Sequence, residues 1–162
     1  MKLKIPYYPQ KNDSLCGPAS LQMVLSFFGQ ETAQKELARI VGLSKKKLKK
    51  FGTPNDKMIE MARTAKFYCY VNEGSTIKEI KYFIHLGLPV IVNYTEPSEN
   101  IGHFAVVIGY SQLTKKIIMN DPSNGKNFKL PESQFLRRWQ ADFEDHHHWL
   151  MVLSRKPLKI GK

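Results

Sequence analysis

The sequence predicts an α+β fold, and three observations support this class. Residues 16 to 86 contain several segments with the apolar spacing of helices, most of them closed by glycine. From Pro89 onward, runs of β-branched residues alternate with turn residues, which is typical of an antiparallel sheet. No linker, repeat or low-complexity tract separates the two halves. We therefore expect one domain over residues 1–162, with a helical portion over about 1–87, a sheet portion over about 88–155 and a cleft between them.

The expected helices lie in the first half of the chain. Cys16 opens the first, an apolar run that ends at Gly29, and Pro18 suits a first helical turn because that turn has no use for its missing N–H. Further helices are expected over residues 32–41, from Ser44 onward, over 56–65 and, capped by Ser75-Thr76, as far as Leu86.

The expected strands lie mainly in the second half. They cover residues 68–71, 90–94, 104–110, 116–120 and 149–153. A short helical segment over about 131–139 precedes the last strand. Helices come first and a sheet follows, which is the α+β order.

The composition indicates a folded protein that does not span a membrane. A hydrophobic fraction of 42% is too high for a disordered chain. The longest apolar stretch, residues 86–94, is far shorter than the ~20 residues that cross a bilayer, and the N-terminus has no apolar signal segment. Cys16 and Cys69 are too few for a disulfide framework, so we expect a reducing, cytoplasmic location, with Cys69 a buried structural thiol among aromatic neighbours.

The formal charge of +11 is concentrated in two lysine-rich clusters. One is Lys45, Lys46, Lys47, Lys49 and Lys50, and the other is Arg155, Lys156, Lys159 and Lys162. Each is either a solvated surface or the contact for an anionic partner. No nucleic-acid-binding motif accompanies them, so nucleic acid is not the partner that we expect, although it stays an alternative.

Three residues suggest a nucleophile and its activating groups. A cysteine at a helix N-terminus, as expected for Cys16, is surrounded by unpaired backbone N–H groups that favour the thiolate. His103 directly precedes the long apolar strand over 104–110, where a residue facing a cleft would lie. Asp121 ends the next strand and would therefore lie near His103 and fix its tautomer.

Each of these residues also has a simpler interpretation. Most histidines are structural or exposed, and Asp121 in Asn120-Asp121-Pro122 could simply bond its own backbone in a turn. Gln10, six residues before Cys16, has no significance by itself, although acyl transfer needs a side-chain donor for the oxyanion.

Taken together, residues 5–10, 15–21, 102–110 and 120–122 resemble the bacteriocin-processing, double-glycine cysteine peptidase family, which belongs to the papain-like proteases. The resemblance extends over nearly the whole chain, because Gly52-Thr53 and residues 88–92 also match the middle segment of the family. It implies a papain-like fold in which the helical portion packs on the antiparallel sheet.

The resemblance also implies a function for each site residue. Cys16 would be the nucleophile, His103 the base, Asp121 the residue that orients the base, and Gln10 the oxyanion-hole side chain of a peptidase that cuts peptides after small residues such as glycine. No cofactor or metal is required. Leu15 stands where exporter-linked members typically have an acidic residue, so the chain is more similar to the free-standing branch.

Other functions remain open at this stage. The same residues could serve an amide-forming acyltransferase, in which an amine accepts the acyl group, or a non-catalytic peptide-binding module. Zinc binding by His146, His147 and His148 is not expected, because three consecutive histidines do not all face one ion on regular structure. We expect them to form a loop.

Overall fold

The computed structural model describes residues 1–140 and 147–159, which contain six helices and six strands. The helices are α1 (Cys16–Phe27), α2 (Gln34–Ile40), α3 (Lys45–Phe51), α4 (Asn55–Thr64), α5 (Ile77–His85) and α6 (Glu132–Arg138). The strands are β1 (Tyr68–Asn72), β2 (Val90–Thr95), β3 (Gly102–Ser111), β4 (Lys116–Asp121), β5 (Gly125–Pro131) and β6 (Leu150–Ser154). The expected α+β class is confirmed.

Local sequence accounts for several helix ends. Ser44 caps α3 by accepting a hydrogen bond of 3.2 Å from the backbone N–H of Lys47, and Thr76 caps α5 in the same way from Glu79. Gly29, beyond the end of α1, has a φ of +83°, a conformation that glycine adopts without strain. Among the described residues, no helix is long and apolar enough to cross a bilayer.

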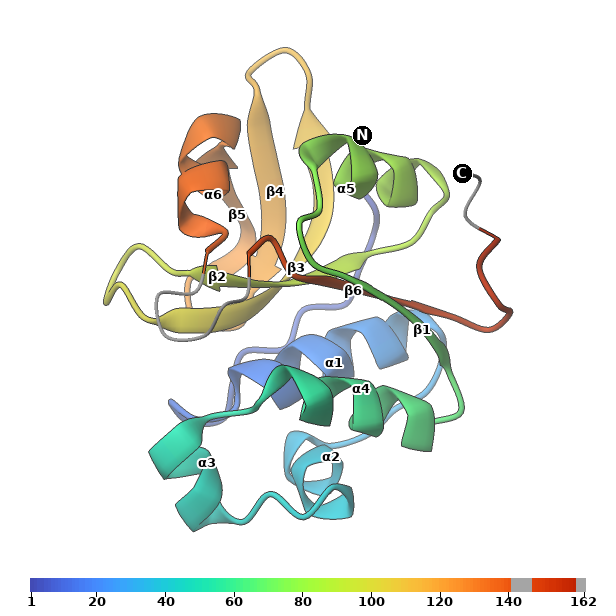
Figure 1. The fold of residues 1–162 in the computed structure, drawn as a ribbon, viewed down its shortest axis with the longest axis vertical. Coiled ribbons are helices and arrows are strands. Elements are labelled where there is room, and N and C mark those ends of the chain that lie inside the picture. The colour runs from blue at the N-terminus through green and yellow to red at the C-terminus, as the bar shows by residue number, and fades with distance from the viewer. Residues whose placement is uncertain (141–146, 160–162) are drawn as a thin grey trace.

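The strands form one antiparallel sheet in the order β1-β6-β2-β3-β4-β5. Helices cover both of its faces: Figure 1 shows α1 to α4 on one side and α5 and α6 on the other. The central strands are buried on both faces, since their successive side chains point alternately into two separate cores.

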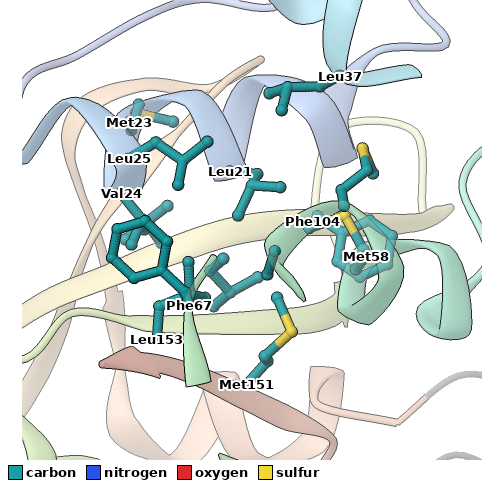
Figure 2. Close-up of a cluster of buried hydrophobic side chains, with 14 of the residues drawn as sticks. Leu21, Met23, Val24, Leu25, Leu37, Met58, Phe67, Phe104, Met151 and Leu153 are labelled. Atoms are coloured by element: carbon teal, nitrogen blue, oxygen red, sulfur yellow. The ribbon is translucent and has the colours of Figure 1, made fainter. Parts of the chain in front are cut away.

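The first core lies between the sheet and the helices α1, α2 and α4. Figure 2 shows part of this core, which includes Leu21 of α1, Met58 of α4, and Phe104 and Met151 of the sheet. The second core lies under α5 and α6 and contains Tyr94, Phe135 and Trp139 among others. The helix α1 therefore packs on one face of the sheet through the first core. The helices α5 and α6 pack on the opposite face of the sheet through the second core.

Two strands depart from the expected division into a helical and a sheet portion. β1, in the expected helical portion, is an edge strand of the sheet and pairs with β6, with Tyr70 opposite Val152. β5 was not expected as a strand, because its sequence GKNFKLP lacks β-branched residues. It is the other edge strand, half exposed, and its ladder with β4 fixes it.

The N-terminal arm is ordered along β3. The backbone N–H of Leu3 donates to the carbonyl of Ile108 at 2.8 Å, and the N–H of Tyr110 donates to the carbonyl of Met1 at 2.9 Å. A side chain at Gly109 would place its Cβ 2.4 Å from the Met1 carbonyl oxygen, so only glycine lets the arm approach this closely. The arm leads directly to Gln10 and Cys16.

Candidate active site

Cys16 is the first residue of α1 and is half-buried at the edge of the first core. Unlike α3 and α5, this helix has no side-chain cap from a described residue, because its N-cap position is Leu15. Its first turn contains no acidic residue. The backbone N–H groups of a first turn have no intrahelical acceptor, so an uncapped start can stabilise a negative charge. The expected placement of Cys16 is confirmed.

Gly17 allows a close approach between α1 and the segment before α4. A Cβ at this position would lie 2.9 Å from the Cβ of Thr53 and 3.0 Å from the sulfur of Met58. The absence of a side chain at Gly17 therefore sets the distance between the two segments and with it the position of Cys16.

His103 and Asp121 form a buried pair. His103 Nε2 lies 2.7 Å from Asp121 Oδ1, and the two residues are 4% and 0% exposed. His103 is the second residue of β3, and Asp121 is the last of the neighbouring strand β4, so the two strand ends meet as expected. Because Nε2 faces Asp121, Nδ1 is the ring nitrogen left for another partner.

The electrostatics connect this pair to Cys16. Burial lowers the pKa of His103, but the hydrogen bond with Asp121 and the interactions with Cys16 and the Asp121 charge outweigh it and raise the pKa to about 10. Burial raises the pKa of Asp121, but its hydrogen bonds and the His103 charge bring the net pKa below the ordinary value. Imidazolium and carboxylate are therefore the favoured forms, and the structure brings Cys16, His103 and Asp121 together.

Asp121 also shapes the turn that follows β4. Its Oδ1 accepts hydrogen bonds of 2.9 Å from the backbone N–H groups of Ser123 and Asn124. The turn interpretation and the histidine-pairing interpretation of this residue are thus both correct, because one carboxylate oxygen does both. These two N–H groups fix the carboxylate beside His103.

Tyr94 contacts the pair, and sequence reasoning missed it. It is fully buried in β2 directly opposite His103, and its hydroxyl donates a hydrogen bond to Asp121 Oδ2. Burial and the Asp121 carboxylate raise the pKa of Tyr94. The alternation of β2 puts Tyr94 on the same face as Val90 and Val92, and a phenol buried at such a position needs a partner, which is the signal that could have identified it.

Gln10 lies at the end of the N-terminal arm and is half-buried. Its Nε2 donates to the carbonyl of Asn12 at 3.0 Å, and its Oε1 is buried without a partner among the described residues. The amide nitrogen carries a second hydrogen, which a ligand can accept.

An apolar hollow of about 390 Å³ lies beside the start of α1, between α2 and α3. Its apolar lining includes Leu15, Ala38, Leu43 and Leu48, and Lys35, Arg39 and Lys45 also line it. Leu15, the residue before Cys16, is part of this lining, whereas Cys16 is not.

Comparison with models of known protein families assigns the chain to a family. The model of the Peptidase C39-like family matches residues 2–144. The chain belongs to this family. No curated protein sequence matches it significantly.

Solved structures of the same kind share the fold. The peptidase domain of Streptococcus ComA, described as a bifunctional ABC transporter involved in quorum sensing, superposes with a TM-score of 0.73 at 20% identity, covering 93% of this chain and 98% of that one. A double-glycine-motif protease from an AMS/PCAT transporter, solved with its leader peptide, gives 0.71 at 22% identity, covering 94% and 92%. A protein from Bacillus anthracis described as a C39-like peptidase gives 0.75 at 17% identity, covering 96% and 98%. The expected papain-like peptidase fold is confirmed.

The remaining cysteine and histidines lie elsewhere. Cys69 on β1 was expected to be buried but is only half-buried, packed against the first core, and this burial raises the pKa of its thiol. His146 lies outside the described residues. His148 stacks on Trp139 with ring centroids 4.7 Å apart, and its Nδ1 lies 2.9 Å from the carbonyl oxygen of Ser75. Both contacts are with residues of the fold, so they favour a structural role for His148.

The lysine run forms α3, and all five lysines are exposed without an ion pair to any described residue. In the second cluster, Arg155 has a structural contact: its guanidinium donates to the carbonyl of Phe28 at 3.1 Å and lies over the ring of Phe67. Lys162 lies outside the described residues. An anionic partner for these clusters stays a prediction.

Proposed function

We propose that this chain is a cysteine peptidase that hydrolyses peptide bonds. In this proposal Cys16 is the nucleophile, His103 the general base, Asp121 the group that orients the base, and Gln10 a donor to the oxyanion. The observation that supports it most is the buried His103–Asp121 pair, whose imidazole interacts with a cysteine at an uncapped helix start. Membership of the Peptidase C39-like family supports the peptidase activity.

In the proposed reaction, the Cys16 thiolate attacks the carbonyl carbon of the peptide bond. The oxyanion accepts hydrogen bonds from the backbone N–H of Cys16 and from the Gln10 amide. As the carbon–nitrogen bond breaks, the His103 imidazolium gives its proton to the leaving amine, and a thioester to Cys16 remains.

Hydrolysis of the thioester completes the cycle. His103, now neutral, takes a proton from a water molecule that attacks the thioester carbonyl. The acid product leaves, and the Cys16 thiolate and the His103 imidazolium form again. Asp121 stays ionised throughout and stabilises the imidazolium.

The proposed substrate is a peptide with a small residue, such as glycine, before the cut. The double-glycine-motif protease solved with its leader peptide supports this proposal, as does family membership. The apolar hollow beside Leu15, rimmed by Lys35 and Arg39, suits an apolar side chain with acidic neighbours, and the charge of +11 favours acidic peptides.

The direct test is cleavage of a peptide panel followed by mass spectrometry. The panel compares peptides that contain Gly-Gly with matched peptides in which Val-Val replaces it. We expect cleavage after Gly-Gly by the wild type and none by Cys16→Ala, while Cys69→Ser retains activity. Binding of the peptides without cleavage would instead indicate a peptide-binding module, and transfer to an added amine would indicate an acyltransferase.

A further inference from the structure

We propose that Tyr94 is a positioning residue, whose hydroxyl holds the Asp121 carboxylate in the orientation that supports a reactive Cys16–His103 pair. This inference rests on the proposed peptidase function. Its basis is the distribution of hydrogen bonds over the two carboxylate oxygens.

The two oxygens of Asp121 have different partners. Oδ1 accepts from His103 and from the backbone N–H groups of Ser123 and Asn124, whereas Tyr94 is the one donor to Oδ2 among the described residues. The side chain of Asp121 is fully buried. Loss of the Tyr94 hydroxyl would therefore leave one oxygen of a buried carboxylate without a partner, which is costly.

The position of Tyr94 is itself fixed. Its ring packs against Phe135 of α6 with centroids 6.3 Å apart, and it meets the His103 ring edge-on at 6.1 Å. Its Cα is opposite that of His103 in the β2–β3 ladder. The hydroxyl is thus held by the sheet and by α6, and Asp121 cannot turn Oδ2 toward His103 without breaking this bond.

Glu96 and Tyr7 are further titratable groups near this cluster, and each has hydrogen-bond partners other than Oδ2 of Asp121. Glu96, 2% exposed and two residues beyond Tyr94, accepts hydrogen bonds from Ser98 and from Asn124 Nδ2. Tyr7 from the N-terminal arm donates to the backbone carbonyl of Asp121 at 2.9 Å. Neither Glu96 nor Tyr7 donates a hydrogen bond to Oδ2.

The test measures the rate of Cys16 alkylation by iodoacetamide from pH 5 to 10, in chains that all carry Cys69→Ser. The variant Tyr94→Phe removes the hydroxyl and keeps the ring. Below pH 7, where reaction needs the imidazolium, we expect its rate to fall about tenfold, as for the loss of one hydrogen bond to a charged group. Above pH 9 the rates should converge, because thiols then ionise unaided.

A matched control and a double-mutant cycle separate positioning from mere stability. Tyr70→Phe also removes a phenol that donates to a carboxylate, that of Glu79 at 2.7 Å, and should leave the rates unchanged. In an Asp121→Asn background, Tyr94→Phe should cause no further fall, because its effect passes through that carboxylate.

Three results would overturn the proposal: an unchanged rate in Tyr94→Phe below pH 7, an equal fall at every pH, or a full further fall in the Asp121→Asn background. If the wild type itself shows no His103-dependent reactivity below pH 7, the proposed peptidase function fails, and the role of Tyr94 fails with it.

A measurement on the folded wild type covers the case in which Tyr94→Phe does not fold. With tyrosine labelled with ¹³C at Cζ, Tyr94 should stay protonated at pH 11, where tyrosines of the unfolded chain are ionised. If Tyr94 instead ionised with the ordinary tyrosine pKa of about 10, this would contradict the bond to Asp121 and overturn the proposal.

Discussion

The backbone N–H of Gln10 donates a hydrogen bond of 3.1 Å to the carbonyl of Pro122, the residue after Asp121. Three residues earlier in the arm, the Tyr7 hydroxyl donates to the carbonyl of Asp121. The N-terminal arm and the end of β4 are therefore tied together. Through these bonds, the proposed oxyanion donor and the residue that orients the base share one frame, although they are more than a hundred residues apart in the chain.

Replacing Gln10 by alanine should lower kcat about 10²- to 10³-fold, the usual effect of losing one oxyanion donor. The bond to Pro122 uses the backbone N–H, so Gln10→Ala keeps the arm in place and KM should change little. Steady-state kinetics on a cleaved peptide measure both. Gln112→Ala, an exposed position in the β3–β4 connection, is the control. Wild-type kcat in Gln10→Ala would remove Gln10 from the proposed site.

Replacing Gly17 by alanine should destabilise the fold by about 1–3 kcal/mol, as overpacking does in well-packed regions. The new methyl would lie 2.9 Å from the Cβ of Thr53, closer than real Cβ atoms approach, and 3.0 Å from the sulfur of Met58, which is a tight contact. Urea denaturation gives the free energy of unfolding. At Gly102 an added Cβ would have ordinary contacts, the nearest at 3.8 Å, so Gly102→Ala should be near neutral. Equal stability of Gly17→Ala and wild type would show that α1 and Thr53 are not in close contact.

The stability of the fold should depend on pH through His103 and Asp121. The pKa of His103 is raised from 6.5 to about 10, so its stabilisation is complete below pH 6.5 and is lost as the pH rises toward 10. The pKa of Asp121 is lowered, so its contribution is present above its ordinary value and is lost as the pH falls through the folded value.

Urea unfolding across the pH range measures both effects. In His103→Gln, the decrease in unfolding free energy between pH 6.5 and 10 should be smaller than in the wild type. Parallel curves for the two proteins over this window would contradict the raised pKa of His103.

Much of the fold was predictable because local patterns determine it. The helix that starts at Cys16, the apolar strands β2, β3 and β6, and the Thr76 cap each have a clear signal in the sequence. The strand β5 was not predictable, since its polar residues suit an exposed edge that only pairing with β4 stabilises. The pairing of β1 with β6 joins segments about 80 residues apart, and no local pattern specifies such a partner.

The candidate site was predictable to the same degree. Cys16, His103 and Asp121 could be named from a helix start, a strand start and a strand end. Tyr94 was missed: the alternation of β2 indicates a buried phenol that needs a partner, but which partner depends on the register that puts it opposite His103 and within reach of Asp121. The catalytic roles of Cys16, His103, Asp121 and Gln10 stay predictions, as does an anionic partner for the lysines of α3, since all of them concern molecules that bind from outside.

The central claim is that Cys16 and His103 form one reactive pair. The measurement that tests it most directly is the pH dependence of Cys16 alkylation by iodoacetamide, with Cys69→Ser in every chain and His103→Ala as the comparison. The proposed site predicts rapid reaction well below pH 7 that disappears in His103→Ala. A thiol that reacts only above about pH 8, and equally in both chains, would contradict the claim and leave a peptide-binding module as the better explanation of the fold.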